Sequence, residues 1–326
     1  MNSFKKILAT GIGFASNIHP LVRREHKNGL TIFMFHEITD TPSSFALRYG
    51  LSVPIGLFEK QIEWISTTYK MIHPTQLLTG CLPHNAALIT FDDGWAGAYK
   101  NALPVLERMK IPCIIFLNMD AINNMVPLVP AAISYLERDD NFIKFASTLK
   151  LSRPYYLSIT PENLKTYEEN NGREYIANTL IEQGELVNCE TLSLWDGNHL
   201  VNYGNHMFNH WNTAVLSDDE VISEYSKNDF LLKKYKSYMP LFAIPHGQWG
   251  PCFGIRQARI VHNLGALKIF AACGSVNNQV NSLVLDRVNV SAAVTSPALL
   301  KFAIARYHLS LKPPLQHELE GIDDGL

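Results

Sequence analysis

Residues 86–95 read AALITFDDGW, in which a run of apolar and β-branched residues ends abruptly at two aspartates and a glycine. The apolar part, 86–91, is typical of a strand buried on both faces in a parallel sheet. In α/β folds, catalytic and ligand-binding groups collect at the carboxyl ends of such strands. Two adjacent carboxylates repel each other, so we expect one of Asp92 and Asp93 to bind a cation and the other to stay free as a base. An ordinary Asp-Asp-Gly turn is the alternative for this stretch taken alone.

The segments around this stretch predict an α/β fold with a parallel sheet. A helical pattern over 96–110 and a second apolar run over 111–117 complete a β-α-β unit with the strand at 86–91. The chain of 326 residues has the length of a single α/β barrel. Further strands are predicted at 30–35, 241–244 and 284–290.

Helices are predicted between these strands. The apolar spacing and capping signals place them at 57–69, from Ser193 to Gly204, after a capping box at 217–220, at 255–264 and from 296 onward. Residues 120–190 do not continue this alternation of strands and helices. They are more charged, have a helical pattern and contain several prolines. We expect a helical insertion or lid there.

Composition restricts the class of protein. The hydrophobic share of 47% supplies a substantial core, and the net charge of −2 gives no basic excess that would indicate nucleic acid as a partner. Five scattered cysteines show no metal or redox spacing. They favour free thiols in a reducing compartment, and therefore a cytoplasmic location.

The two ends of the chain differ from the rest. Lys5 and Lys6 precede a short, glycine-interrupted apolar stretch at 7–15. This stretch is too short to cross a bilayer. We expect residues 1–28 to contact the inner face of a membrane peripherally, and a weak signal for secretion is the alternative. Residues 311–326 read as a polar, loosely held tail.

A second cluster with metal-binding chemistry lies at 204–211, where His206 and His210 are four residues apart. Two imidazoles at this spacing can reach one metal ion, with Asp93 or Asp92 as the oxygen ligand. Three protein ligands leave a position open for water, as in catalytic zinc sites. The pattern His-Glu-x-x-His of helical metalloproteases is absent.

Together these motifs resemble those of the polysaccharide deacetylase family, also called the NodB-homology family. Residues 90–94 (TFDDG) followed by His206-x-x-x-His210 are similar to its first two motifs. Residues 35–38 (FHEI) resemble a segment near the start of many members, and 242–247 (FAIPHG) resemble a variant of its third motif. The resemblance covers most of the chain outside 120–190 and the two termini.

The resemblance implies a distorted (β/α) barrel, which we expect over residues 29–310. It assigns Asp92 as general base and places Asp93, His206 and His210 on one divalent metal ion. Zinc is the expected metal, with cobalt, nickel and manganese as alternatives. The implied activity is removal of N-acetyl groups from a sugar of a cell-surface polysaccharide or its lipid-linked precursor, so the expected partner is an N-acetylated glycan or glycolipid.

The sequence departs from the family at two functional positions. The usual Leu-x-His motif is replaced by Leu285-Asp286-Arg287, so the acid of the reaction is assigned to His36, as in relatives with permuted motifs, with His246 as the rival. The arginine usual in the third motif is also missing. We expect Arg287 to replace it and to orient Asp92 through a charged hydrogen bond.

Substrate contacts and alternative functions stay open at this point. Trp95, Trp211 and His246 are candidates for sugar binding, although core packing is the more common role of tryptophan. An O-deacetylase needs the same base and metal. A carbohydrate-binding protein on a catalytically decayed barrel is the alternative from another class. A phosphoryl-transfer enzyme has no support, because no glycine-rich phosphate loop is present.

Overall fold

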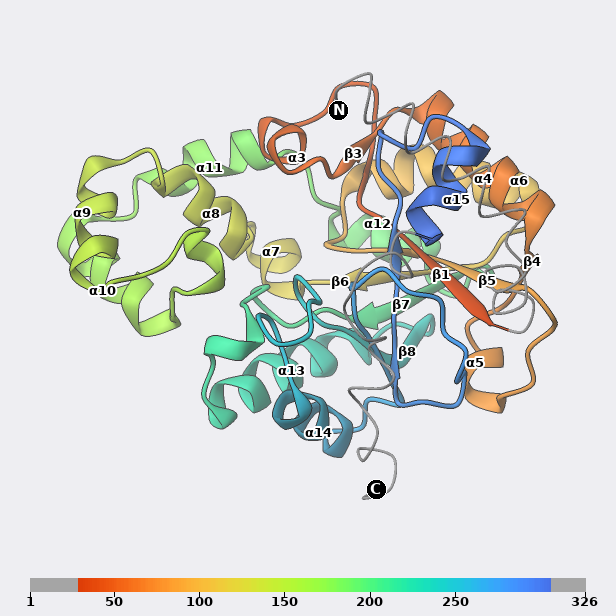
Figure 1. The fold of residues 1–326 in the computed structure, drawn as a ribbon. Helices are drawn as coiled ribbons and strands as arrows, with labels where there is room; N and C mark the ends of the chain where they lie inside the picture. Colours follow the sequence, from red (N-terminus) through yellow and green to blue (C-terminus); the bar gives the residue numbers. More distant parts are fainter. Residues whose placement is uncertain (1–28, 306–326) are drawn as a thin grey trace.

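The computed structural model describes residues 29–305, which form a curled parallel sheet surrounded by helices (Figure 1). Every ladder between neighbouring strands of this sheet is parallel. The strand order is β10-β9-β8-β7-β6-β5-β1-β11, with β4 beside β5. The strands are β1 (Leu30–Phe35), β4 (Lys70–Met71), β5 (Ala86–Phe91), β6 (Cys113–Leu117), β7 (Val201–Asn205), β8 (Tyr238–Ala243), β9 (Lys268–Phe270), β10 (Val284–Leu285) and β11 (Val288–Asn289); β2 (Glu37–Ile38) and β3 (Ser52–Val53) pair separately. The distorted (β/α) barrel expected from the sequence is confirmed.

The apolar runs predicted as strands are buried along their whole length. Every residue of β1 and β5 is buried, as a strand covered on both faces requires. The β-α-β unit predicted over 86–117 is present, although its helix starts with a π-helical turn, Ala98–Ala102, before α6 (Leu103–Met109). Pro104 stands in the first turn of α6, directly after this π-helical turn, where its fixed φ suits a helix.

The remaining helices fall into two groups. Those around the sheet are α3 (Ser44–Tyr49), α4 (Ile55–Thr68), α5 (Gln76–Thr79), α13 (Asp218–Leu232), α14 (Ile255–Asn263) and α15 (Pro297–Ala305). The segment predicted as a helical insertion contains α7 (Met119–Asn124), α8 (Val129–Leu136), α9 (Asp140–Thr148), α10 (Pro161–Asn171) and α11 (Tyr175–Gln183), followed by α12 (Cys189–Trp195). In Figure 1, α8 to α11 project to one side of the sheet. The capping box at α13 is confirmed, with Ser217 and Glu220 bonding reciprocally.

The helix predicted from Ser193 to Gly204 is wrong. Helix α12 ends at Trp195, and residues 201–205 form β7 instead. Gly204 explains this, because a Cβ there would lie 2.4 Å from the ring of Phe116 on the neighbouring strand. The glycine therefore serves close packing between strands rather than a helix end.

The strand predicted at 284–290 is interrupted. β10 pairs with β9 and β11 pairs with β1, so one short segment joins both edges of the curled sheet. Between them, Asp286 bonds through its own N–H and C=O to the side chain of Asn277 instead of to a neighbouring strand. Arg287 follows at this seam, and it is 1% exposed.

Some expectations concern residues outside 29–305 or the chain as a whole. The membrane contact of 1–28 and the tail at 311–326 lie outside the described residues. Among the described helices, none combines the length and apolar character that a bilayer crossing requires. The five cysteines, all of which lie within 29–305, form no disulfide bond.

Candidate active site

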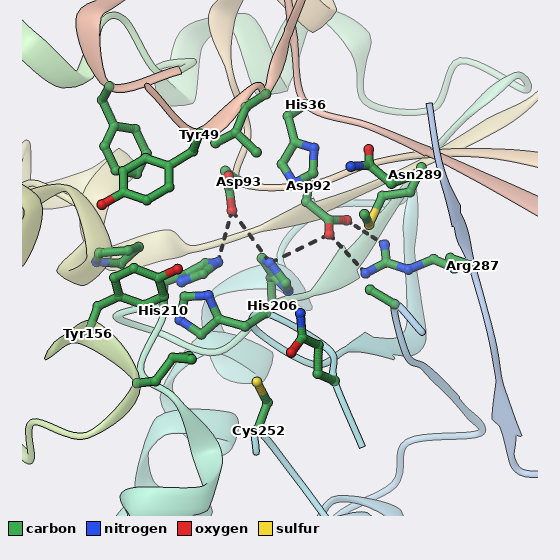
Figure 2. Close-up of a pocket in the computed structure, with 18 residues that line it drawn as sticks. His36, Tyr49, Asp92, Asp93, Tyr156, His206, His210, Cys252, Arg287 and Asn289 are labelled. Carbon is green, nitrogen blue, oxygen red and sulfur yellow. Dashed lines mark hydrogen bonds and ion pairs between the residues drawn. The ribbon is translucent and has the colours of Figure 1, made fainter. Parts of the chain in front are cut away.

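The carboxyl ends of the strands enclose a cavity of about 310 Å³ (Figure 2). The aspartate, histidine and arginine side chains that line it follow five strands, β1, β5, β7, β8 and β10, and they bring together residues far apart in the sequence. They are His36 after β1, Asp92 and Asp93 after β5, His206 and His210 after β7, His246 after β8, and Arg287 between β10 and β11.

Asp93, His206 and His210 form a compact buried group. Their nearest ligand atoms all lie within 4.8 Å of one another. Asp93 Oδ1 is 3.1 Å from His210 Nε2 and 3.5 Å from His206 Nε2. The site predicted from the sequence is thus assembled from β5 and from the turn after β7.

The hydrogen bonds around His206 show that this group suits a cation. Its Nδ1 lies 2.7 Å from the carbonyl oxygen of Ala243, which can only accept, so Nδ1 carries the hydrogen. Burial lowers the pKa of His206, but Asp92 and Asp93 outweigh it and raise that pKa above its ordinary value, so the site favours a positive charge at Nε2. In the neutral ring Nε2 carries a lone pair toward Asp93, whose Oδ1 receives no hydrogen bond. Because an imidazole lone pair and a carboxylate repel, the arrangement fits a positive ion placed between them. His206 and His210 with Asp93 are therefore a donor set that fits a zinc-like ion.

The backbone at the site is held in conformations that favour glycine. Asp93, Met207, His210 and His246 all have positive φ, between 59° and 69°. Such conformations cost free energy in non-glycine residues and cluster at functional sites. Met207, directly after the first histidine, turns its side chain into the apolar core and is fully buried.

A network of buried asparagines supports the turn that carries the histidines. Asn118 donates to the carbonyl oxygens of His206 and Met207. Asn205 accepts from the backbone N–H of Met207 at 3.0 Å and from Asn228 at 2.7 Å. All three asparagines are completely buried. The local sequence pattern does not predict this network, because its members come from three separate segments.

Arg287 holds Asp92 from the opposite side. Its Nη1 and Nη2 donate to the two carboxylate oxygens at 2.6 and 2.9 Å, and its Nε donates to Ala271 O at 3.0 Å. Burial alone would raise the pKa of Asp92, but Arg287 and His206 outweigh it, and the pKa lies below the ordinary value. The bidentate contact fixes both the charge and the orientation of this carboxylate.

His36 and His246 line the same cavity without belonging to the metal group. Burial lowers the pKa of His36, against the opposing effect of Asp93 and Asp92. Burial and the neighbouring His210 hold the pKa of His246 well below its usual value. The His246 ring packs on His210 and on Tyr156, with centroids 4.8 and 5.0 Å apart, and its Nε2 has no hydrogen-bond partner.

The two tryptophans suggested as sugar contacts do not line the cavity. Trp95 is fully buried, and its Nε1 donates to Asp93 Oδ2 at 3.1 Å, so it supports the metal group from behind. Trp211 is 6% exposed and belongs to the apolar core. Tyr49 and Tyr156 line the cavity instead. Both lie in short or irregular segments, where the sequence carries no periodic pattern that would single them out.

Comparisons with known proteins agree with this fold. Residues 79–259, more than half of the chain, match a family model described as polysaccharide deacetylase. A search of curated proteins finds no match. Among solved structures, IcaB from Ammonifex degensii superposes with a TM-score of 0.57 at 18% identity, covering 85% of this chain and 97% of that one.

Two further solved structures share the fold. A Streptococcus pyogenes deacetylase, PplD, in complex with acetate has a TM-score of 0.53 at 16% identity, covering 88% of this chain and 100% of that one. A de-N-acetylase from Aggregatibacter actinomycetemcomitans has a TM-score of 0.55 at 13% identity, with 84% and 99% covered. At these identities the likeness establishes a common fold.

Proposed function

The chain belongs to the polysaccharide deacetylase family, and from this premise we propose that it hydrolyses N-acetyl groups on a sugar of a cell-surface polysaccharide or of its lipid-linked precursor. The proposed reaction depends on one divalent metal ion, with zinc as the expected metal. The observation that carries the proposal is the convergence of Asp93, His206 and His210 beside the Arg287-bound carboxylate of Asp92.

Asp93, His206 and His210 would hold the ion. Two imidazoles and one carboxylate suit zinc and leave a coordination position open. When bound, such an ion polarises the acetyl carbonyl and lowers the pKa of water. The bond from His206 Nδ1 to Ala243 O and the bond from Trp95 Nε1 to Asp93 Oδ2 would keep two of the three ligands in place.

Asp92 is the proposed general base. It lies beside the metal group, with its Oδ2 3.8 Å from His206 Nε2, and its lowered pKa keeps it ionised at neutral pH. An ionised, oriented carboxylate can take the proton of the water that attacks the acetyl carbon. Arg287 would keep that carboxylate aimed at the cavity while it accepts the proton.

His36 is the proposed acid that protonates the departing sugar amine. It lines the same cavity and lies beside Asp92 in Figure 2. Its lowered pKa makes it an uncharged imidazole at rest, so it would protonate the amine after receiving the proton that Asp92 removes from the attacking water. The nearby carboxylates of Asp92 and Asp93 favour that protonated form.

Metal analysis tests the proposal before any substrate is known. We expect about one divalent ion per chain in the purified protein, lost in Asp93→Ala and His206→Ala and retained in the control His199→Ala, whose side chain is exposed. A wild-type protein that takes up no zinc, cobalt or nickel would contradict metal dependence.

Acetate release then tests the chemistry. Wild-type protein loaded with zinc should release acetate from N-acetylated oligosaccharides, and Asp92→Asn should abolish this while its metal content stays unchanged. A wild type that binds acetylated sugars and releases no acetate would favour the carbohydrate-binding alternative. Parallel assays on O-acetylated sugars separate amide from ester hydrolysis.

A further inference from the structure

Two tyrosines close one side of the cavity. Tyr49 lies at the end of α3, and Tyr156 lies in a short 3-10 turn, Tyr155–Leu157, of the helical insertion. Their rings meet edge to face with centroids 5.8 Å apart. Figure 2 shows both on the same side of the cavity, across from Arg287. Because the two segments meet here, a long chain cannot leave the cavity between them.

We call Tyr49 and Tyr156 the tyrosine wall, and contacts on both sides hold this wall in place. Arg48, next to Tyr49, donates to the carbonyl oxygen and the hydroxyl of Ser134 on α8, at 3.1 and 2.8 Å. Behind Tyr49, the ring of Phe45 packs against Tyr49 and stacks on Trp95. The α3 segment and the insertion are therefore attached to each other as well as to the core.

The insertion is also anchored directly beside the metal group. Val187 N–H donates to Gly94 O at 2.8 Å, and Ala96 N–H donates to Glu185 O at 3.0 Å, which pairs the end of the insertion with the residues after Asp93. Tyr156 itself reaches the metal group through His246, whose ring packs on Tyr156 and on His210 with centroids 5.0 and 4.8 Å apart. A wall with these attachments belongs to the site in its resting form.

The charged side chains that line the cavity restrict which sugars it can bind. Among the residues that line it, Arg287 is the only lysine or arginine, and its guanidinium is occupied by Asp92. Away from the metal position, a phosphate or carboxylate on the bound sugar would find no free lysine or arginine among these residues, and it would face the carboxylates of Asp92 and Asp93. The volume of about 310 Å³ is at the small end of the range for ligand sites.

We propose that this cavity takes one uncharged N-acylated sugar at the end of its glycan, packed against Tyr49 and Tyr156, rather than a sugar within a polysaccharide chain. A sugar ring presents an apolar C–H face that suits an aromatic side chain. Because the two rings block this side of the cavity, a glycan chain cannot continue from the bound sugar past Tyr49 and Tyr156. The inference rests on the proposed function, because it names which sugar of the substrate is placed at the metal group.

The first experiment maps where acetate is lost. Zinc-loaded full-length protein is incubated with N-acetylglucosamine oligomers of increasing length, labelled at one end, and the products are sequenced by mass spectrometry. Loss of acetate from one terminal sugar at every length is expected. Loss from internal sugars would overturn the inference while leaving the proposed function intact.

Variants then test the wall itself. Tyr156→Ala should raise KM roughly tenfold, the cost of one aromatic contact, with unchanged metal content, and Tyr156→Phe should restore the wild-type value. In the double variant Tyr49→Ala, Tyr156→Ala, internal sugars should begin to lose acetate. Tyr135→Ala is the control, since Tyr135 belongs to the same insertion but does not line the cavity. An unchanged product pattern in the double variant would overturn the role of the wall.

Binding separates failure of the inference from failure of the proposed function. If the wild type holds zinc but releases no acetate, the proposed function fails. The binding affinities of the same oligomers, measured by calorimetry, then test whether the cavity recognises a terminal sugar. Equal affinity for the monosaccharide and the longer oligomers, weakened in Tyr156→Ala, supports recognition of a terminal sugar. Affinity that rises with length, or no binding at all, overturns it.

Discussion

Arg287 donates two hydrogen bonds to the carboxylate of Asp92 across 195 positions of sequence, and both side chains are almost completely buried. The contact joins the end of β5 to the seam at which β10 and β11 meet the two edges of the sheet. A buried pair of this kind costs solvation free energy, so it contributes less to net stability than its short distances suggest. Its clearer effect is on the charge and orientation of Asp92, where the proposed reaction needs a base.

Replacing Arg287 by lysine should therefore impair catalysis more than folding. Lysine keeps the charge but cannot form the bidentate contact, so we expect kcat to fall by roughly 10- to 100-fold with the zinc content unchanged. Losing part of the stabilisation of the ionised form should raise the pKa of Asp92. The acid limb of the rate profile should then move to higher pH, which a pH series of acetate release measures.

Arg256→Lys is the matched control, because Arg256 pairs with Asp218 at the surface of the protein. Exposed pairs of this type contribute little, so its rate and pH profile should equal those of the wild type. An Arg287→Lys protein with a normal rate and an unshifted acid limb would show that Arg287 does not act through Asp92.

Metal binding should stabilise the folded protein measurably. Asp93, His206 and His210 converge only in the folded chain, so zinc at a hundredfold excess over its Kd adds about 2.7 kcal/mol to the free energy of unfolding. Thermal melts with and without zinc should show a rise in Tm for the wild type and none for His210→Ala. A chelator should reverse the rise. An equal rise in both proteins would mean that zinc binds elsewhere.

The asparagine network predicts a variant that affects stability and metal affinity together. Asn228 accepts from Met119 N–H and donates to Leu117 O and Asn205 Oδ1, all at 2.7–2.8 Å. Asn228→Leu removes all three bonds and leaves the buried Met119 N–H without its acceptor, and we expect a loss of about 2–4 kcal/mol in urea unfolding. Zinc affinity should fall roughly tenfold as the turn carrying His206 loosens. Asn170→Ala, an exposed helical position, should change neither quantity.

The parts of the fold that the sequence predicts well are those with long apolar runs. β1 and β5 are six-residue strands buried on both faces, and that burial is visible as apolar sequence interrupted by one threonine in each strand. β7 reads Val-Asn-Tyr-Gly-Asn, and its polar residues bond within the core instead of facing water. A pattern based on hydrophobicity cannot recognise such a strand.

The same distinction applies to the site. Asp92, Asp93, His206 and His210 belong to compact motifs, and the structure brings them together. The residues proposed to contact the substrate depend on long-range packing. Tyr49 and Tyr156 meet because a hydrogen bond joins α3 to the insertion. Tryptophans next to motif residues are conspicuous in sequence, yet Trp95 faces the core.

A buried carboxylate outside the proposed reaction predicts how stability depends on pH. Glu224, on α13, is 8% exposed and accepts a hydrogen bond from Asn209 N–H at 2.8 Å, next to His210. Burial raises the pKa of Glu224 from 4.5 to about 7, in spite of that bond. The folded protein therefore binds the proton more tightly than the unfolded chain does, so stability should fall as the pH rises through this window.

Glu224→Gln removes this titration and retains an oxygen that can accept from Asn209. The stability of the variant relative to the wild type should increase between pH 5 and pH 8, by about 3 kcal/mol at most, because one pKa unit corresponds to 1.36 kcal/mol. Urea unfolding at both pH values measures the difference, with the exposed Glu169→Gln as the control. A difference that stays constant with pH would show that Glu224 is ionised in the folded protein as readily as in the unfolded chain. The bond from Asn209 would then have to offset the whole cost of burying the charge.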